Sequence, residues 1–223
     1  MRAKIELHNQ DCMVAMKDMA DNQFDLAICD PPYGIGENPS RALGRARSTA
    51  KWKNARPVIY KGGNWDIQPD KCYFDEVIRV SKNYIMWGAN HYISKVPYDS
   101  SCWLIWYKKE QNPNSDFADC EIALTSFKSA VRYFNFAWTG FGAINAGEKR
   151  IHPTQKPIKL YKWILNKYAK EGDKILDTHL GSGSIAIACW DLKFDLVGYE
   201  LDKEYYDSAM KRFNTHCKQG QLF

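Results

Sequence analysis

Short apolar runs alternate with amphipathic stretches along this chain. Seven runs of four to eight residues are bounded by polar or turn-forming residues, which is typical of buried strands. They cover residues 4–8, 24–29, 83–90, 102–107, 121–127, 174–177 and 194–199. Apolar residues recur at helical spacing in four other stretches, at about residues 65–80, 157–168, 185–192 and 203–213. Strands that alternate with helices predict an α/β fold.

The strand at residues 24–29 leads directly into Asp30-Pro31-Pro32-Tyr33. The two prolines end the apolar run and stiffen the loop, because proline fixes φ and cannot donate to a β-ladder. An acid, a constrained carbonyl and an aromatic ring are therefore expected together at the end of a strand, where α/β sheets bind ligands.

These groups suit methylation of an exocyclic amine on a nucleobase. The lone pair of such an amine is delocalised into the ring, so the nitrogen is a poor nucleophile. If Asp30 and the Pro31 carbonyl each accept one N–H, the lone pair can point at a methyl donor. The Tyr33 ring would stack on the base, a contact worth roughly 1–3 kcal/mol. The alternative is a plain turn in which Asp30 caps and Tyr33 packs.

Residues 174–200 have the order of a nucleotide-binding unit: strand, glycine turn, helix, strand, acid. Gly181 and Gly183 allow a ligand to approach closely, and Glu200 follows the second strand, where an acid accepts from ribose hydroxyls. The third glycine of the dinucleotide fingerprint is missing, which disfavours a dehydrogenase. A ligand with ribose and adenine but no pyrophosphate fits better, and S-adenosylmethionine is such a ligand.

Two other segments are candidates for the same ligand. Asp11 follows the first strand, and it either accepts from an adenine amino group or caps the next helix. The sequence at residues 152–157, His-Pro-Thr-Gln-Lys-Pro, precedes a helix whose N-terminus favours an anion. With Thr154 and Lys156 beside it, that helix start is expected to bind the carboxylate of the methionine part.

The net charge of +5 is concentrated in one segment. Residues 34–64 are rich in glycine and contain the seven candidate DNA-binding residues, with no acid from residue 41 to residue 61. These are Arg41, Arg45, Arg47, Lys51, Lys53, Arg56 and Lys61. A long loop with this charge suits an arm that grips phosphates beside the catalytic loop. A solvated charge run is the simpler alternative.

Composition excludes several other classes of protein. With 223 residues, 45% hydrophobic and 26% charged, the chain suits one catalytic domain over residues 1–223. No apolar run approaches the roughly 20 residues of a membrane helix, and the polar start lacks a signal-peptide core, so we expect a cytoplasmic protein. The seven scattered cysteines include no Cys-x-x-Cys pair, and we assign no metal.

The ordered set of motifs resembles the β group of DNA amino-methyltransferases over nearly the whole chain. In that family the Asp-Pro-Pro-Tyr loop comes first, a short target-recognition region follows, here residues 128–151, and the cofactor motif comes last. The resemblance implies a Rossmann-like methyltransferase fold with a mixed seven-stranded sheet, one antiparallel strand, and helices on both faces. The strand near residue 5 would lie beside the one near 197, and the catalytic strand beside the one that ends at Asp177.

The resemblance also assigns the site residues. The catalytic residues would be Asp30, Pro31, Pro32 and Tyr33. The residues that bind S-adenosylmethionine would be Asp11, Cys12, Asp30, His152, Thr154, Gln155, Lys156, Asp177, Leu180, Gly181, Ser182, Gly183, Ser184 and Glu200. The family's glycine loop usually reads Asp-Pro-Phe-x-Gly-Ser-Gly, and we place Thr178 and Leu180 at its Pro and Phe, with Leu180 still able to pack on the cofactor.

An Asp at position 30 favours N6-adenine as the target amine over N4-cytosine, where Ser is commoner in this family. N4-cytosine methylation, RNA methylation, and a non-catalytic DNA-binding protein on the same fold remain alternatives. Family members are often dimers, so a homodimer is expected. The tail at residues 219–223 resembles the peptide by which bacterial replication proteins dock on the sliding clamp, although a frayed terminus is the favoured interpretation.

Overall fold

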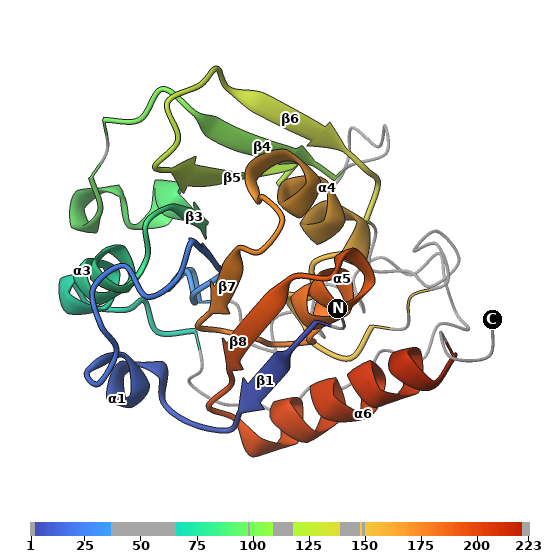
Figure 1. The fold of residues 1–223 in the computed structure, drawn as a ribbon. Coiled ribbons are helices and arrows are strands. Elements are labelled where there is room, and N and C mark those ends of the chain that lie inside the picture. Colours follow the sequence, from blue (N-terminus) through green and yellow to red (C-terminus); the bar gives the residue numbers. More distant parts are fainter. Residues whose placement is uncertain are drawn as a thin grey trace.

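A single twisted sheet forms the centre of the molecule (Figure 1). The computed structural model describes residues 3–36, 66–97, 99–108, 118–138, 148 and 150–219. Its strands are β1 (Ile5–His8), β2 (Leu26–Cys29), β3 (Tyr84–Trp87), β4 (Trp103–Tyr107), β5 (Cys120–Thr125), β6 (Arg132–Asn135), β7 (Lys174–Asp177) and β8 (Asp195–Tyr199). Its helices are α1 (Cys12–Met16), α3 (Lys71–Val80), α4 (Ile158–Tyr168), α5 (Ser184–Leu192) and α6 (Lys203–Gln219), with 3₁₀ turns at Ala89–His91 and Ile93–Lys95.

The strand order is β1-β8-β7-β2-β3-β5-β4-β6. β5 runs antiparallel to both of its neighbours, and the other described pairs are parallel. The expected mixed sheet with one antiparallel strand is therefore confirmed. The expected number of strands is wrong, because the described residues form eight. The extra strand is β6, which pairs with β4 and lies within the predicted target-recognition region.

Two hydrophobic cores pack against opposite faces of the sheet. Successive side chains of a strand point to opposite faces, so Leu26 and Ile28 join the core under α4, α5 and α6. Ala27 and Cys29 join the core under α1 and α3. Figure 1 shows these two groups of helices on the two sides of the sheet, as the family resemblance implies.

The strand order places the catalytic strand beside the cofactor strand. β2 pairs with β7, with Ala27 opposite Leu176, and β1 pairs with β8, with Ile5 opposite Leu196. Both adjacencies agree with the expectation. The connection through α3 leads from β2 to β3, whereas the connection through α5 leads the other way, from β7 to β8. The boundary between β2 and β7 is thus a topological switch point, where α/β sheets bind ligands at the carboxyl ends of their strands.

Some boundaries differ from the prediction. The helix expected from about residue 65 begins at Lys71, after Asp70, and α6 continues beyond residue 213 to Gln219. None of the helices that the structure describes is both long enough and apolar enough to span a bilayer. The seven candidate DNA-binding residues and residues 220–223 of the tail lie outside the described residues.

Candidate active site

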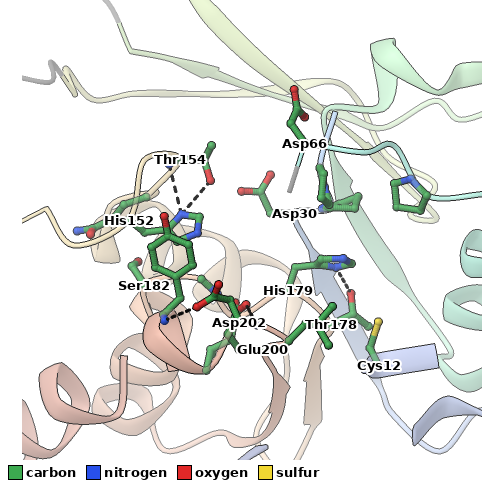
Figure 2. Close-up of a pocket in the computed structure, with 18 of the residues that line it drawn as sticks. Cys12, Asp30, Asp66, His152, Thr154, Thr178, His179, Ser182, Glu200 and Asp202 are labelled. Carbon is green, nitrogen blue, oxygen red and sulfur yellow. Dashed lines mark hydrogen bonds between the residues drawn. The ribbon is translucent and has the colours of Figure 1, made fainter. Parts of the chain in front are cut away.

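A cavity of about 760 Å³ opens at the carboxyl ends of β1, β2, β7 and β8. Ligand pockets commonly have volumes of about 300–1,000 Å³. The four residues of the Asp30–Tyr33 loop line it, together with most of the predicted cofactor residues. The latter are Asp11, Cys12, His152, Thr154, Gln155, Lys156, Leu180, Gly181, Ser182 and Glu200. Figure 2 shows Asp30 on the opposite side of this cavity from Glu200 and Asp202.

Three predicted cofactor residues do not line the cavity in the described structure. Asp177 is 1% exposed, and its carboxyl group accepts the backbone N–H of His179 at 3.0 Å. Gly183 caps α5 with φ of 70°, and a Cβ there would lie 3.2 Å from the Cβ of Ala209. Ser184 begins α5 and is buried. These three residues therefore support the glycine loop from the side away from the cavity.

Glu200 holds the glycine loop from the cavity side. Its two carboxylate oxygens accept the N–H of Gly181 at 2.8 Å and the N–H of Asp202 at 2.9 Å. Each carboxylate oxygen has two lone pairs, so both can still accept from the hydroxyls of a ribose. Burial raises the pKa of Glu200 above its usual value, and it raises the pKa of Asp177 to about 8.

The third position of the glycine loop was assigned wrongly from the sequence. Counted along Asp-Pro-Phe-x-Gly-Ser-Gly from Asp177, the residue at the Phe position is His179, and Leu180 takes the variable position. The His179 ring lines the cavity and packs edge-on against Tyr73, with ring centroids 5.3 Å apart. Burial lowers the pKa of His179 to about 4, so the ring is neutral at pH 7.

The start of α4 already has a carboxylate partner within the chain. Glu148 accepts the N–H of Ile158 at 3.1 Å and pairs with Arg212 at 2.8 Å. The sequence predicted that the methionine carboxylate of a cofactor would bind at this helix start, and the structure places Glu148 there instead. Arg212 also donates to the Ser182 carbonyl at 2.9 Å, so this ion pair connects α4 to the glycine loop.

The loop before α4 is held by its own side chains. The Gln155 side-chain oxygen accepts the N–H of Ile151 at 2.9 Å, and the Gln155 backbone carbonyl accepts the indole N–H of Trp138 at 2.8 Å. Thr154 contacts the His152 ring nitrogen at 3.1 Å. The pKa of His152 is lowered to about 4, mainly by burial and to a smaller extent by the nearby Arg150 and Lys156. This ring is therefore also neutral at pH 7.

Asp11 caps α1, which was one of its two expected roles. Its carboxylate accepts the N–H of Met13 at 2.8 Å. Asp11 and Cys12 also line the cavity, so the second expected role, contact with an adenine amino group, remains a prediction. Burial raises the pKa of the Cys12 thiol to about 12, which keeps it protonated.

Asp30 is engaged on both carboxylate oxygens. Lys156 Nζ lies 2.6 Å from Oδ2, and the Tyr33 hydroxyl donates to Oδ1 at 2.7 Å. Burial raises the pKa of Asp30, and Lys156 opposes that rise. Burial also raises the pKa of Tyr33 well above its usual value, so its hydroxyl keeps its proton.

The Tyr33 ring packs on the chain itself in this structure. It stacks on the His91 ring with centroids 5.2 Å apart and an interplanar angle of 18°. It also lies against Gly88, where an added Cβ would come within 2.0 Å of a ring carbon. The sequence predicts that the Tyr33 ring stacks on a base, and in the structure the ring stacks on His91.

Sequence reasoning missed Glu121 and Lys108 beside Asp30. Glu121 lies on β5, where its Oε2 is 3.0 Å from Lys156 Nζ and 3.3 Å from the Tyr33 hydroxyl, while Lys108 from β4 binds its Oε1. Burial acts to raise the pKa of Glu121, but the two lysines outweigh it and hold the pKa at about 2. The available signal was a single acid inside an apolar strand.

The described residues contain no cluster of three or more His, Cys, Asp or Glu side chains that could hold a metal ion.

Comparison with known proteins identifies the family. A family model described as DNA methylase, of the N6 and N4 type, matches residues 24–211. The type II methyltransferase M2.DpnII of Streptococcus pneumoniae is 43% identical over an alignment of 257 residues, which covers 95% of this chain and 90% of that protein. The type II methyltransferase M.HpaI of Haemophilus parainfluenzae is 24% identical over 239 residues, covering 90% of this chain and 71% of that protein.

Solved structures show the same fold. M1.HpyAVI in complex with S-adenosylmethionine matches with a TM-score of 0.56 at 21% identity, over 93% of this chain and 99% of that one. The cytosine-N4-specific PvuII methyltransferase matches with a TM-score of 0.61 at 10% identity, over 96% of this chain and 87% of that one. The length of the family match and the identity to M2.DpnII together show that this chain belongs to the N6/N4 family of DNA methylases.

Proposed function

We propose that this DNA methyltransferase transfers the methyl group of S-adenosylmethionine to the N6 amino group of adenine. One observation carries the proposal: the Asp30–Tyr33 loop and the Gly181–Glu200 half of the site open into one cavity, although about 150 residues separate them. A donor held by the second half can therefore face an amine held by the first.

The charge of the cavity suits the donor. The lining includes five carboxyl groups and two ammonium groups. The carboxyl groups are those of Asp11, Asp30, Asp66, Glu200 and Asp202, and the ammonium groups are those of Lys156 and Lys203. When bound, S-adenosylmethionine supplies a methyl group attached to a positively charged sulfur, and excess carboxylates favour that charge.

The chain's own contribution is to hold and orient the amine. Asp30 and the Pro31 carbonyl would each accept one N–H, so that the nitrogen lone pair points at the methyl carbon. As the new N–C bond replaces the S–C bond, the amine would lose one proton, and Asp30 would accept it. Alignment of two reactants can lower a barrier by about 7–11 kcal/mol in favourable cases.

The choice of adenine rests on Asp30 and the resemblance, because the two amines offer the same geometry to a carboxylate and a carbonyl. The test uses purified protein, methyl-deuterated donor, and DNA from cells that lack base methylation. Mass spectrometry of the digested nucleosides should detect deuterated N6-methyladenine. Deuterated N4-methylcytosine would support the alternative target, and no deuterated base in DNA would favour the non-catalytic alternative. Labelled RNA in a parallel reaction would reveal an RNA methyltransferase.

We propose that the basic segment contacts DNA phosphates. The test replaces Arg41, Arg45 and Arg47 and measures DNA affinity at several salt concentrations. Each phosphate contact that is lost should reduce the slope of log affinity against log salt by about 0.9. Replacement of all three by Gln should therefore flatten the salt dependence, whereas Lys replacements should preserve it. An unchanged slope in the Gln variant would refute the contact.

Two partner predictions remain. A homodimer would appear in light scattering as twice the chain mass of 25.8 kDa. Docking on a sliding clamp would be lost when Leu222 and Phe223 are changed to Ala, and a pull-down that is insensitive to those changes would exclude it.

A further inference from the structure

A buried ammonium group lies where the target amine is expected to bind. The Lys156 side chain is 2% exposed, and its Nζ lies 2.6 Å from Asp30 Oδ2 and 3.0 Å from Glu121 Oε2. It also donates to the Tyr33 hydroxyl at 3.1 Å. Lys156 therefore bridges the Asp30 carboxylate on one side and the Glu121 carboxylate on the other.

The ammonium group and a target amine compete for Asp30. Both are N–H donors. The Tyr33 hydroxyl donates to Oδ1 and Lys156 Nζ lies 2.6 Å from Oδ2, so an amine at either oxygen must share it with a donor that is already there, and it binds best where that donor moves away. Separating the ammonium group from Asp30 would leave a buried charge without its partner, which is strongly destabilising. A neutral amine displaces the ammonium readily only if Lys156 has another anion to bind.

Glu121 is such an anion, and it lies on the side away from the cavity. Asp30 and Lys156 belong to the described lining of the cavity, whereas Glu121 does not. Lys108 holds the other oxygen of Glu121, which fixes the carboxylate in place. Movement of Nζ toward Glu121 would therefore take the ammonium group away from the space that a base must enter, without leaving the charge unpaired.

We propose that Lys156 occupies the place of the target amine on Asp30 in the base-free enzyme, and moves onto Glu121 when a base enters. Lys156 and Glu121 are then positioning residues, which act through Asp30. This proposal rests on the methyl transfer proposed above, and it gives Lys156 a role different from the cofactor contact that the sequence predicted.

The pH profile separates this role from a structural one. The titratable groups that face the cluster are Asp30, Tyr33, His91, Tyr92, Lys108, Glu121, His152, Lys156, Tyr161 and Asp177. Transfer requires ionised Asp30, so its pKa sets the acid limb of kcat/KM. Loss of the Lys156 charge raises that pKa, and loss of the Glu121 charge lowers it. Lys156→Met should move the limb up by about 1–3 pH units, and Glu121→Gln should move it down by about one.

Rates give the second signature. In Glu121→Gln the ammonium group loses its alternative anion and stays on Asp30, so kcat/KM for DNA at pH 8 should fall about tenfold, the effect of losing one charged hydrogen bond. In the double variant Lys156→Met/Glu121→Gln the competitor is absent, so the loss caused by Glu121→Gln should largely disappear. Affinity for S-adenosylmethionine, measured by calorimetry, should stay within about twofold of wild type in Glu121→Gln.

Glu76→Gln is the matched control, because Glu76 pairs with Arg79 on α3 outside the described lining of the cavity. Glu121→Gln preserves the size of the side chain. If its kcat/KM for DNA and the acid limb of its pH profile are the same as those of Glu76→Gln, the proposal is overturned. Equal losses in Glu121→Gln and the double variant would also overturn it. If wild-type protein transfers no methyl group to DNA, the proposed function fails, and that result is distinct from either of these.

Discussion

The two halves of the cavity are built on different interactions. In the half proposed to bind the cofactor, carboxyl groups accept backbone N–H groups: Glu200 binds Gly181, and Asp177 binds His179. In the half proposed to bind the base, ionised side chains bind one another, with Lys156 between Asp30 and Glu121. The first set lies within about 25 residues of sequence, whereas the second joins three separate parts of the chain.

This difference indicates which half changes on binding. Backbone contacts fix the glycine loop before any ligand arrives, which suits a donor bound in one geometry at every turnover. Side-chain ion pairs can exchange partners without moving the backbone, which suits a base that must enter and leave. Substitutions in the half that contains the glycine loop should therefore affect donor binding, and substitutions around Asp30 should affect methyl transfer.

The largest expected effect comes from Asp30. Asp30→Asn keeps the size of the side chain but supplies an amide in place of the carboxylate that we propose accepts an N–H of the target amine. Methyl transfer to DNA should fall by about a hundred- to a thousandfold, as when one preorganised hydrogen-bonding group is lost from an active site. Donor affinity by calorimetry should change little. The control is Asp75→Asn, at an exposed acid paired with Lys71. A comparable loss of donor affinity in Asp30→Asn would mean that Asp30 supports the structure of both halves.

Glu200 should show the reverse pattern. Glu200→Ala removes the acceptor of two backbone N–H groups and the predicted partner of the ribose. The Kd for S-adenosylmethionine should rise about 10- to 100-fold, because hydrogen bonds to charged groups contribute about 1.5–3 kcal/mol. At saturating donor, kcat should recover most of its wild-type value. Exposed Glu204→Ala serves as the control. Unchanged donor affinity in Glu200→Ala would contradict the assignment of this half.

A matched pair of glycines gives the smallest effects. Gly88 and Gly183 have φ of 75° and 70°, so the left-handed backbone alone should cost Ala at either position about 1–2 kcal/mol in the free energy of unfolding, measured with urea. At Gly88 the overlap with the Tyr33 ring adds to that cost. Gly88→Ala places a methyl group on the Tyr33 ring and should impair transfer at full donor occupancy. Gly183→Ala presses on Ala209 behind the glycine loop and should weaken donor binding. Identical functional profiles for the two variants would remove the distinction between the halves.

The sequence predicts the local parts of this structure well. Strand positions follow from apolar runs that end in proline, glycine or acids, and the glycine loop with Glu200 follows from a compact strand-turn-helix-strand pattern. Strand adjacency and the antiparallel strand came from the family resemblance. The eighth strand was missed because the mixed aromatic and polar residues of Arg132–Asn135 fit a recognition loop almost equally well.

Contacts between distant segments could not be predicted in the same way. Nothing local to Glu121 indicates that it shares an ammonium group with Asp30, about 90 residues earlier in the chain. Lys156 was assigned to the donor because a lysine before a helix start suits an anion, and the nearest anions proved to be Asp30 and Glu121. Glu148 took the predicted carboxylate position for the same reason, since tertiary structure brought it to the start of α4.

A crystal structure of the protein with S-adenosylmethionine would show whether the donor and the target amine share one cavity. We expect the ribose at Glu200, the glycine loop against the donor, and the sulfonium methyl group directed toward Asp30. Donor density at any other place, or a methyl group directed away from Asp30 with the ribose remote from Glu200, would contradict it.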